Sequence, residues 1–160
     1  MPLASTRTSA SPDDAYLAAR GLKTLALRIR QQNRSAMQIA AFLEGHDAVA
    51  NVNYPGLPGN PQHARARQLF NGFGGMLSFE LKGGEVAARK FFDAVQLPIL
   101  APSLGGVETL ISHPATMTHA AIGEKGRRAI GITDGLVRLS VGIEDPQDII
   151  ADLEVALKAM

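Results

Sequence analysis

The residue of this sequence with the clearest chemical potential is Arg138, which lies within an apolar run. In a strand from Leu136 to Val141 side chains alternate between two faces, so Arg138 shares one face with Leu136 and Ser140. A guanidinium among apolar neighbours is costly unless it meets an anion. Its planar fork suits a carboxylate that accepts two parallel hydrogen bonds. The residues alone leave two interpretations open: an ion pair with an Asp or Glu of this chain, or a binding site for the carboxylate of a ligand.

A second candidate for a functional segment is Ser103-Leu104-Gly105-Gly106, which follows an apolar strand and Pro102. The glycines permit a tight turn or a close approach of the backbone to a ligand. The serine offers a hydroxyl and a backbone amide. An ordinary turn between two strands explains the same residues. The segment is not a Gly-x-Ser-x-Gly nucleophile elbow, so serine hydrolysis has no support.

Other chemistries find little support. The chain has no cysteine, and its histidines have no recognised ligand spacing, so we expect no metal site. The segment Gly72-Phe73-Gly74-Gly75 lacks the third glycine and the following helix of a dinucleotide-binding loop, and it is interpreted as a turn. The histidines are His46, His63, His113 and His119.

The composition limits the kinds of molecule that this protein is expected to bind. The formal net charge is +1, and the basic cluster between Arg20 and Arg34 has no interleaved aromatic residues, so nucleic-acid binding is not expected. No apolar run approaches the roughly 20 residues that span a bilayer, and residues 1–10 do not form a signal peptide. We expect a cytoplasmic protein without membrane association, with a disordered segment at residues 1–10 and one domain at residues 11–160.

Hydrophobic periodicity and turn residues predict the elements of this domain. Because helices and strands do not alternate strictly, we predict an α+β fold, with a small mixed or antiparallel sheet and helices packed on one face. An apolar stripe from Leu22 through Leu25 and Ile29 to Leu43 is expected on the first helix, which Gly21 bends or splits. Helices are predicted at residues 12–45, 61–70, 85–95 and from 145 onward, and strands at 49–54, 76–81, 99–101, 108–112 and 136–142.

Six segments are informative as an ordered set. They are residues 11–25 (SPDDAYLAARGLKTL), 54–57 (YPGL), 72–79 (GFGGMLSF), 103–114 (SLGGVETLISHP), 113–119 (HPATMTH) and 134–145 (DGLVRLSVGIED). In this order they resemble the C-terminal domain of the Cys/Met-metabolism family of pyridoxal-phosphate (PLP) enzymes. That family includes cystathionine γ-synthase, cystathionine γ-lyase and methionine γ-lyase. The resemblance extends from about Ser11 to the C-terminus and implies the C-terminal domain of fold-type I PLP enzymes.

The resemblance assigns a substrate site. It implies that Arg138 holds the α-carboxylate of an amino-acid substrate and that Ser103 and Leu104 line the same pocket. Glu108 corresponds to a position near the part of the pocket that influences the choice of substrate side chain. Asp13 departs from the family pattern, in which an aromatic or apolar residue is common, and we expect only a changed contact at the helix start.

The family's cofactor-binding residues have no counterpart in this sequence. In such enzymes an N-terminal domain supplies the Schiff-base lysine, a phosphate cradle, an aspartate and a stacked tyrosine. Lys23 lies in a helical family motif distinct from that of the cofactor lysine. The resemblance therefore implies no catalytic or PLP-binding residue here, and a chain that is inactive alone.

Two functional hypotheses remain. The first is the C-terminal, substrate-binding part of a PLP-dependent transsulfuration enzyme, acting on sulfur amino acids or activated homoserine by β- or γ-elimination or replacement. The second is a non-catalytic module that binds a carboxylate or pairs with a separate lysine-bearing half. In either case we expect a homo-oligomer, and an apolar patch near the first helix and the Ser103 loop where a partner domain is missing.

Overall fold

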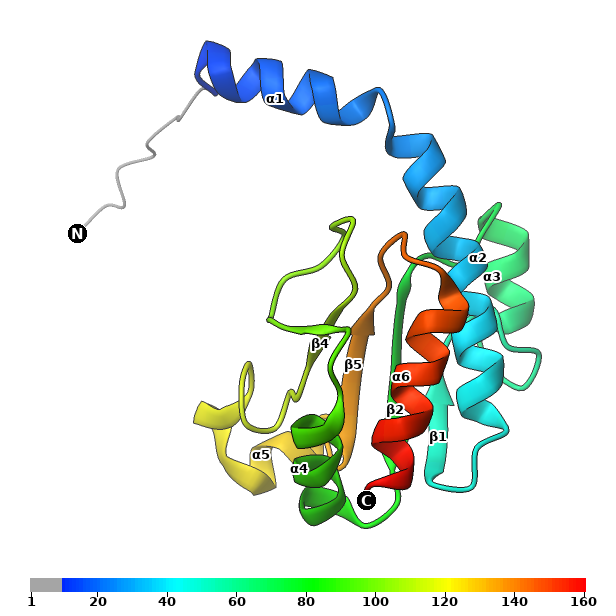
Figure 1. The fold of residues 1–160 in the computed structure, drawn as a ribbon, viewed down its shortest axis with the longest axis vertical. Coiled ribbons are helices and arrows are strands. Elements are labelled where there is room, and N and C mark those ends of the chain that lie inside the picture. The colour runs from blue at the N-terminus through cyan, green and yellow to red at the C-terminus, as the bar shows by residue number, and fades with distance from the viewer. Residues whose placement is uncertain (1–9) are drawn as a thin grey trace.

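A five-stranded sheet in the order β1-β2-β5-β4-β3 forms the centre of residues 10–160, the part of the chain that the computed structural model describes (Figure 1). The neighbouring pairs β1–β2, β2–β5 and β5–β4 are antiparallel, and β3 runs parallel to β4. The sheet is therefore mixed, as predicted. The strands are β1 (Val49–Asn53), β2 (Met76–Leu81), β3 (Ile99–Leu100), β4 (Leu110–Ser112) and β5 (Leu136–Ser140).

Three helices cover one face of this sheet: α2 (Leu25–Glu44), α4 (Gly84–Ala94) and α6 (Pro146–Lys158) (Figure 1). The predicted α+β class, with helices packed on one face, is confirmed. The predicted disordered segment lies almost entirely outside the described residues. The remaining helices are α1 (Pro12–Leu22), α3 (His63–Leu69), the 3₁₀ turn η1 (Ala120–Ile122) and α5 (Gly123–Ala129).

The core lies between the sheet and the three helices. Alternation along β2 buries Leu77, Phe79 and Leu81, as predicted, while the residues between them remain partly exposed. Phe79 packs edge-to-face on Phe91 of α4 with ring centroids 5.8 Å apart. On β5, the alternation buries Val137 and Leu139. The same alternation places Arg138 on the face that the three helices leave uncovered.

Local signals at two helix starts agree with the sequence prediction. Ser11 and Asp14 form a capping box at the start of α1. The side chain of Asp145 accepts a hydrogen bond of 2.9 Å from the Gln147 amide, and Pro146 occupies the first turn of α6. Both helices therefore begin where their cap residues require.

The predicted long first helix is split, and the first half of its apolar stripe is not buried. The break falls at Lys23 and Thr24, two residues after Gly21. α1, which is described throughout, has no buried residue and leads away from the body of the molecule (Figure 1). Leu22 is 65% exposed and Ile29 is 43% exposed, so the predicted apolar stripe is largely open to solvent at its start.

The sequence prediction also missed the helical turns η1 and α5. Both lie in a stretch that was assigned to loop. Gly123 and Gly131 border α5 with φ angles of 68° and 79°, and Gly126 lies inside it. Glycine is unfavourable inside a helix. The glycines in this stretch therefore predicted a loop, although the structure has a seven-residue helix there.

None of the helices in residues 10–160 combines the length and the apolar character that crossing a membrane requires.

Replacing Phe79 with alanine tests the core. Phe79 is fully buried, so Phe79→Ala should lower the free energy of unfolding by about 3–5 kcal/mol, measured by urea denaturation. Phe70→Ala is the matched control, because Phe70 is 62% exposed and its loss should cost less than about 0.5 kcal/mol. Equal effects of the two substitutions would contradict this packing.

Candidate functional site

Arg138 contacts backbone carbonyls of the loop that precedes β4. Its Nη2 donates to the carbonyl of Ser103 at 2.9 Å, and its Nη1 donates to the carbonyl of Pro102 at 3.3 Å. These contacts join positions 35 and 36 residues apart. The guanidinium is therefore oriented by the loop at residues 102–109, which we call the carbonyl loop.

No carboxylate of the chain pairs with Arg138. Among residues 10–160, no Asp or Glu oxygen lies within 4.0 Å of its guanidinium nitrogens. Residues 1–9 contain no Asp or Glu. The internal ion pair, which the residues alone left open, is therefore not formed. Carbonyl oxygens orient a guanidinium without neutralising its charge, so Arg138 keeps a full positive charge available for an anion.

The carbonyl loop is itself anchored to the body of the molecule. The Gly105 amide donates to Oγ of Ser140 at 3.0 Å, which lies on the same strand face as Arg138. Nε2 of Gln32, a buried residue of α2, donates to the Gly106 carbonyl at 2.8 Å. Sequence reasoning placed Ser140 beside Arg138 by alternation, but nothing in the local pattern pointed to Gln32.

The four predicted site residues are only partly brought together. Ser103 contacts Arg138, although through its carbonyl and not through its hydroxyl. Leu104 is 60% exposed on the same loop. Glu108 is also exposed, and its carboxylate lies over Gly106, where a Cβ atom would be 2.5 Å from its Oε1. Among residues 10–160, the hydrogen bonds of the Arg138 guanidinium go to Pro102 and Ser103, and none joins it to Leu104 or Glu108.

A hollow of about 370 Å³ lies beside Arg138 on the uncovered face of the sheet. Its floor is formed by side chains of β1, β2 and β5, and its wall by the segment that follows β4. The lining is mostly apolar, but its polar side chains offer hydrogen-bond donors and acceptors, and Arg138 is its only Lys or Arg among the described residues. The lining residues are Asn53, Met76, Leu77, Ser78, Pro114, Thr118, His119, Ile132, Leu136 and Arg138.

The wall of this hollow is held by hydrogen bonds at its two ends. His113 Nε2 lies 3.0 Å from the Asp134 carbonyl, and Arg127 donates to the Asp134 carboxylate at 2.7 Å. The hydrogen bond from Arg127 lowers the pKa of Asp134 below its usual value, burial opposes this shift, and the charges of Arg127 and Arg128 add to it. The segment is thus closed into a loop at the start of β5.

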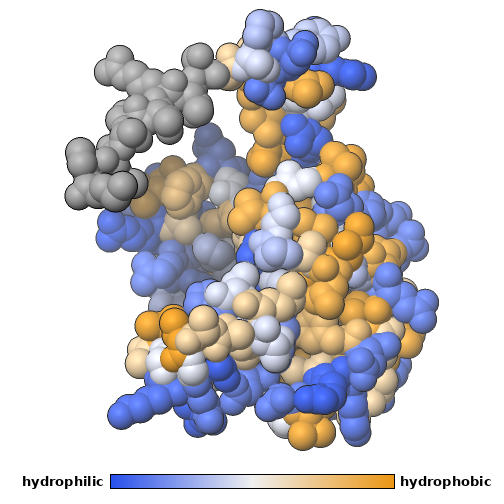
Figure 2. Space-filling view, turned by 90° about the vertical axis from the view of Figure 1, so that its left-hand side faces the viewer, coloured by the Kyte–Doolittle hydropathy of each residue, from blue (hydrophilic) through white to orange (hydrophobic). Residues whose placement is uncertain are grey.

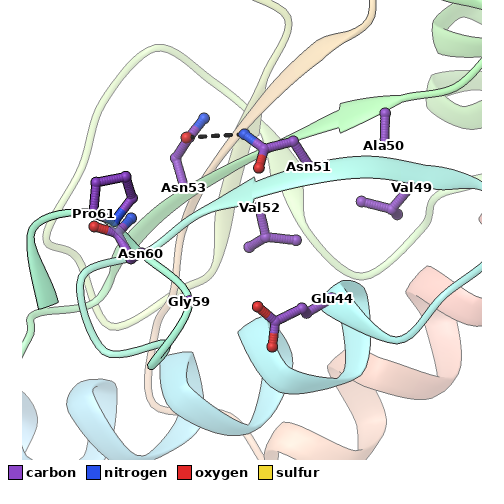
Figure 3. A pocket seen from close by; sticks show the side chains of 9 residues that line it. All are labelled: Glu44, Val49, Ala50, Asn51, Val52, Asn53, Gly59, Asn60 and Pro61. Carbon is purple, nitrogen blue, oxygen red and sulfur yellow. Dashed lines mark hydrogen bonds between the residues drawn. The ribbon is translucent and has the colours of Figure 1, made fainter.

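A second hollow, of about 280 Å³, lies along the outer edge of β1 and is shown in Figure 3. Asn51 donates to Asn53 at 3.1 Å within it, and Glu44 approaches from the end of α2. Glu44 is its only charged lining residue among those described. Within residues 10–160, no three His, Cys, Asp or Glu side chains are placed to hold a metal ion. The hollow beside Arg138 is therefore the stronger candidate for function.

Comparison with solved structures identifies the class of this fold. The chain superposes on cystathionine gamma synthase from Xanthomonas oryzae pv. oryzae, solved in complex with cystathionine, with a TM-score of 0.89 and 51% sequence identity. The match covers 94% of this chain and 39% of that protein. The fold is therefore one found in PLP-dependent transsulfuration enzymes of fold type I.

The chain belongs to the Cys/Met metabolism PLP-dependent enzyme family, whose sequence profile it matches over residues 4–158. It is 52% identical over 148 residues to a cystathionine beta-lyase of Coxiella burnetii, covering 92% of this chain and 38% of that protein. It is 52% identical over 150 residues to an L-methionine gamma-lyase of Pseudomonas deceptionensis, covering 94% and 38%. The predicted family is confirmed, and the chain spans well under half the length of these relatives.

The residues of this chain do not fit covalent attachment of the family's cofactor. A lysine that attacks an aldehyde must lose its proton near neutral pH, which burial favours and exposure does not. No lysine lines the hollow beside Arg138. All the lysines of the chain are exposed: Lys23, Lys82, Lys90, Lys125 and Lys158.

The ion pair between Arg127 and Asp134 predicts that a variant without the Asp134 carboxylate differs from wild type in stability by an amount that depends on pH. Because the folded pKa of Asp134 is lowered, its contribution is present above the unfolded value of about 3.9 and is lost as pH falls through the folded pKa. Asp134→Asn should therefore destabilise the chain above about pH 5, and the difference from wild type should shrink below about pH 4. Urea denaturation across this range measures it.

The control for this experiment is Glu85→Gln. Glu85 pairs with Arg89 on the surface of α4, where both side chains are mostly exposed. Such pairs contribute only about 0.3–0.5 kcal/mol, so this variant should follow the wild-type profile. A difference between Asp134→Asn and wild type that does not change with pH would contradict the assigned role of the ion pair.

Proposed function

We propose that this chain is the C-terminal, substrate-binding part of a PLP-dependent transsulfuration enzyme, in which Arg138 binds the α-carboxylate of an amino acid. The observation that carries the proposal is the unneutralised guanidinium of Arg138, oriented by two carbonyls beside a hollow. An arginine has five N–H donors, and two of those of Arg138 contact the carbonyl loop. The remaining donors suffice for a bidentate carboxylate.

The relatives support the substrate class. The chain is similar to a cystathionine beta-lyase, an L-methionine gamma-lyase and a cystathionine gamma synthase. We infer sulfur amino acids or activated homoserine as substrates, with elimination or replacement at the β- or γ-carbon. PLP, when bound in the complete enzyme, supplies the electron sink for this chemistry. The contribution of this chain is to hold the substrate carboxylate and so orient the reacting carbon atoms.

In this proposal the cofactor-bearing part of the enzyme packs against the projecting surface, which we define as the exposed apolar side chains of α1 and the start of α2. In Figure 2 apolar side chains on these projecting helices continue onto the body below them. Exposed apolar residues gathered on one element typically mark an interface. The members of the projecting surface are Tyr16, Leu17, Leu22, Leu25, Leu27 and Ile29.

A non-catalytic module remains the second candidate, and the exposure of all the lysines is compatible with both candidates. In that case the chain pairs with a separate lysine-bearing half, or binds a carboxylate for regulation. Both candidates use Arg138 and the projecting surface in the same way. The regulatory version of the second candidate predicts no turnover when a cofactor-bearing part is supplied, whereas the first candidate predicts turnover.

A chimera tests the role of Arg138. This chain should replace the matching 38% of the Coxiella burnetii cystathionine beta-lyase, and the chimera should turn over cystathionine while the chain alone should not. Loss of charge-assisted hydrogen bonds to a carboxylate costs about 1.5–3 kcal/mol, or roughly 10- to 150-fold. Arg138→Ala in the chimera should therefore raise KM by about tenfold or more and leave the PLP absorbance unchanged.

The matched control is Arg65→Ala, which removes the same charge from the exposed surface of α3 and should leave KM unchanged. An unchanged KM in Arg138→Ala would contradict carboxylate binding. Unfolding of Arg138→Ala, seen as loss of the cooperative thermal transition, would instead indicate a structural role. A folded chimera that binds PLP without turnover would favour the non-catalytic module.

The projecting surface predicts association. Leu17 and Leu27 are 59% and 62% exposed, so the double substitution Leu17→Glu and Leu27→Glu should not destabilise the folded chain. It should weaken capture of the separately expressed remainder of the Xanthomonas oryzae enzyme by about tenfold or more, since two buried leucines contribute several kcal/mol. Val86→Glu on α4, also mostly exposed, is the control. Equal capture by the two variants would place the interface elsewhere.

A further inference from the structure

The connection between β5 and α6 makes a second set of contacts with the carbonyl loop. Oε2 of Glu144 accepts a hydrogen bond of 2.8 Å from the Thr109 hydroxyl, and Oε1 accepts one from the Thr109 amide. The Thr109 hydroxyl in turn accepts from the Gly142 amide at 2.9 Å. One carboxylate thus satisfies both hydrogen-bond donors of a threonine that is fully buried.

The backbone approaches closely at the same point. The Ile143 amide donates to the Val107 carbonyl at 2.9 Å. A Cβ atom on Gly142 would lie 2.3 Å from the Val107 oxygen and 2.4 Å from Oε2 of Glu144. Only glycine fits there. The Glu144 side chain and the Gly142 backbone together clamp the end of the carbonyl loop.

The role of Glu144 is distinct from helix capping. The next residue, Asp145, caps α6 through the Gln147 amide, so the helix start does not require Glu144. Arg34 lines the same hollow as Glu144, but within residues 10–160 no cation lies within ion-pair distance of the Glu144 carboxylate. Within residues 10–160, both hydrogen bonds of the Glu144 carboxylate go to Thr109.

We propose that Glu144 is a positioning residue for the carboxylate site, which acts by holding the carbonyl loop in the position from which Pro102 and Ser103 orient Arg138. This inference rests on the proposed function for its effect on substrate, but its effect on the loop stands without it. Removal of the Glu144 carboxylate leaves two buried donors of Thr109 without a partner, which is unfavourable. The loop then relaxes, and the Arg138 guanidinium loses its fixed orientation.

Four substitutions test the clamp in the full chain. Glu144→Ala removes the acceptor, and Glu144→Gln retains one acceptor oxygen and serves as partial rescue. Thr109→Val removes the hydroxyl at constant shape, whereas Thr109→Ser retains it. Glu124→Gln is the control, since it removes one carboxylate from the exposed surface of α5.

NMR hydrogen exchange and the guanidinium signals of Arg138 are the direct measurements. In Glu144→Ala and Thr109→Val, the Gly105 and Gly142 amides should exchange about tenfold faster or more, as expected for loss of a charge-assisted hydrogen bond. The Nη signals of Arg138 should broaden or average in the same variants. Thr109→Ser and Glu124→Gln should match wild type, and Glu144→Gln should be intermediate.

The chimera with the Coxiella burnetii cystathionine beta-lyase supplies a functional measurement. Glu144→Ala should raise KM for cystathionine by about tenfold with PLP absorbance unchanged. Unchanged Arg138 signals and Gly105 exchange in both Glu144→Ala and Thr109→Val would overturn the inference. If Arg138→Ala leaves KM unchanged while these signals still move, the proposed function fails and the clamp stands. If Arg138→Ala raises KM and Glu144→Ala does not, the positioning role fails alone.

Discussion

The interaction on which the site depends is the contact of the Arg138 guanidinium with two backbone carbonyls. A carboxylate in their place would neutralise the charge and fill the donors that a ligand needs. Carbonyls orient the planar group at the cost of two N–H donors and leave its charge intact. The position of the carbonyl loop therefore determines the orientation of Arg138, and residues of other elements hold this loop in place.

Holding that loop involves elements from across the domain. Ser140 on β5 holds Gly105, Gln32 on α2 holds Gly106, and the connection after β5 clamps Thr109. Each anchor extends from an element whose position is set by the core on the covered face of the sheet. The apolar packing of the three helices therefore determines the geometry of a polar site on the opposite face.

The sequence predicted much of this arrangement where the information is local. Period-two alternation assigned the faces of β2 and β5, and the placement of a guanidinium within an apolar strand singled out Arg138 before any family was considered. The carbonyl partners could not be predicted, because they join residues more than 30 positions apart and any loop can offer a carbonyl. The contact of Glu144 with the carbonyl loop was not predicted either, because acidic residues are common at helix starts and Glu144 therefore showed no unusual feature. An apolar patch near the first helix was predicted, and Leu22 and Ile29 are exposed there. An apolar stripe on a helix predicts that another element covers it. The stripe does not tell whether that element belongs to the same chain.

The helix α2 connects the projecting surface to the site. Its first seven residues precede Gln32, which is its first buried residue, and they carry part of the projecting surface. Gln32 is also the residue that holds the Gly106 carbonyl of the carbonyl loop. A single α-helix is stiff over this distance, since each residue is fixed by hydrogen bonds to the turns before and after it. The projecting surface and the loop that orients Arg138 are therefore attached to one rigid element, which joins the proposed interface at one end to the proposed carboxylate site at the other (Figure 1).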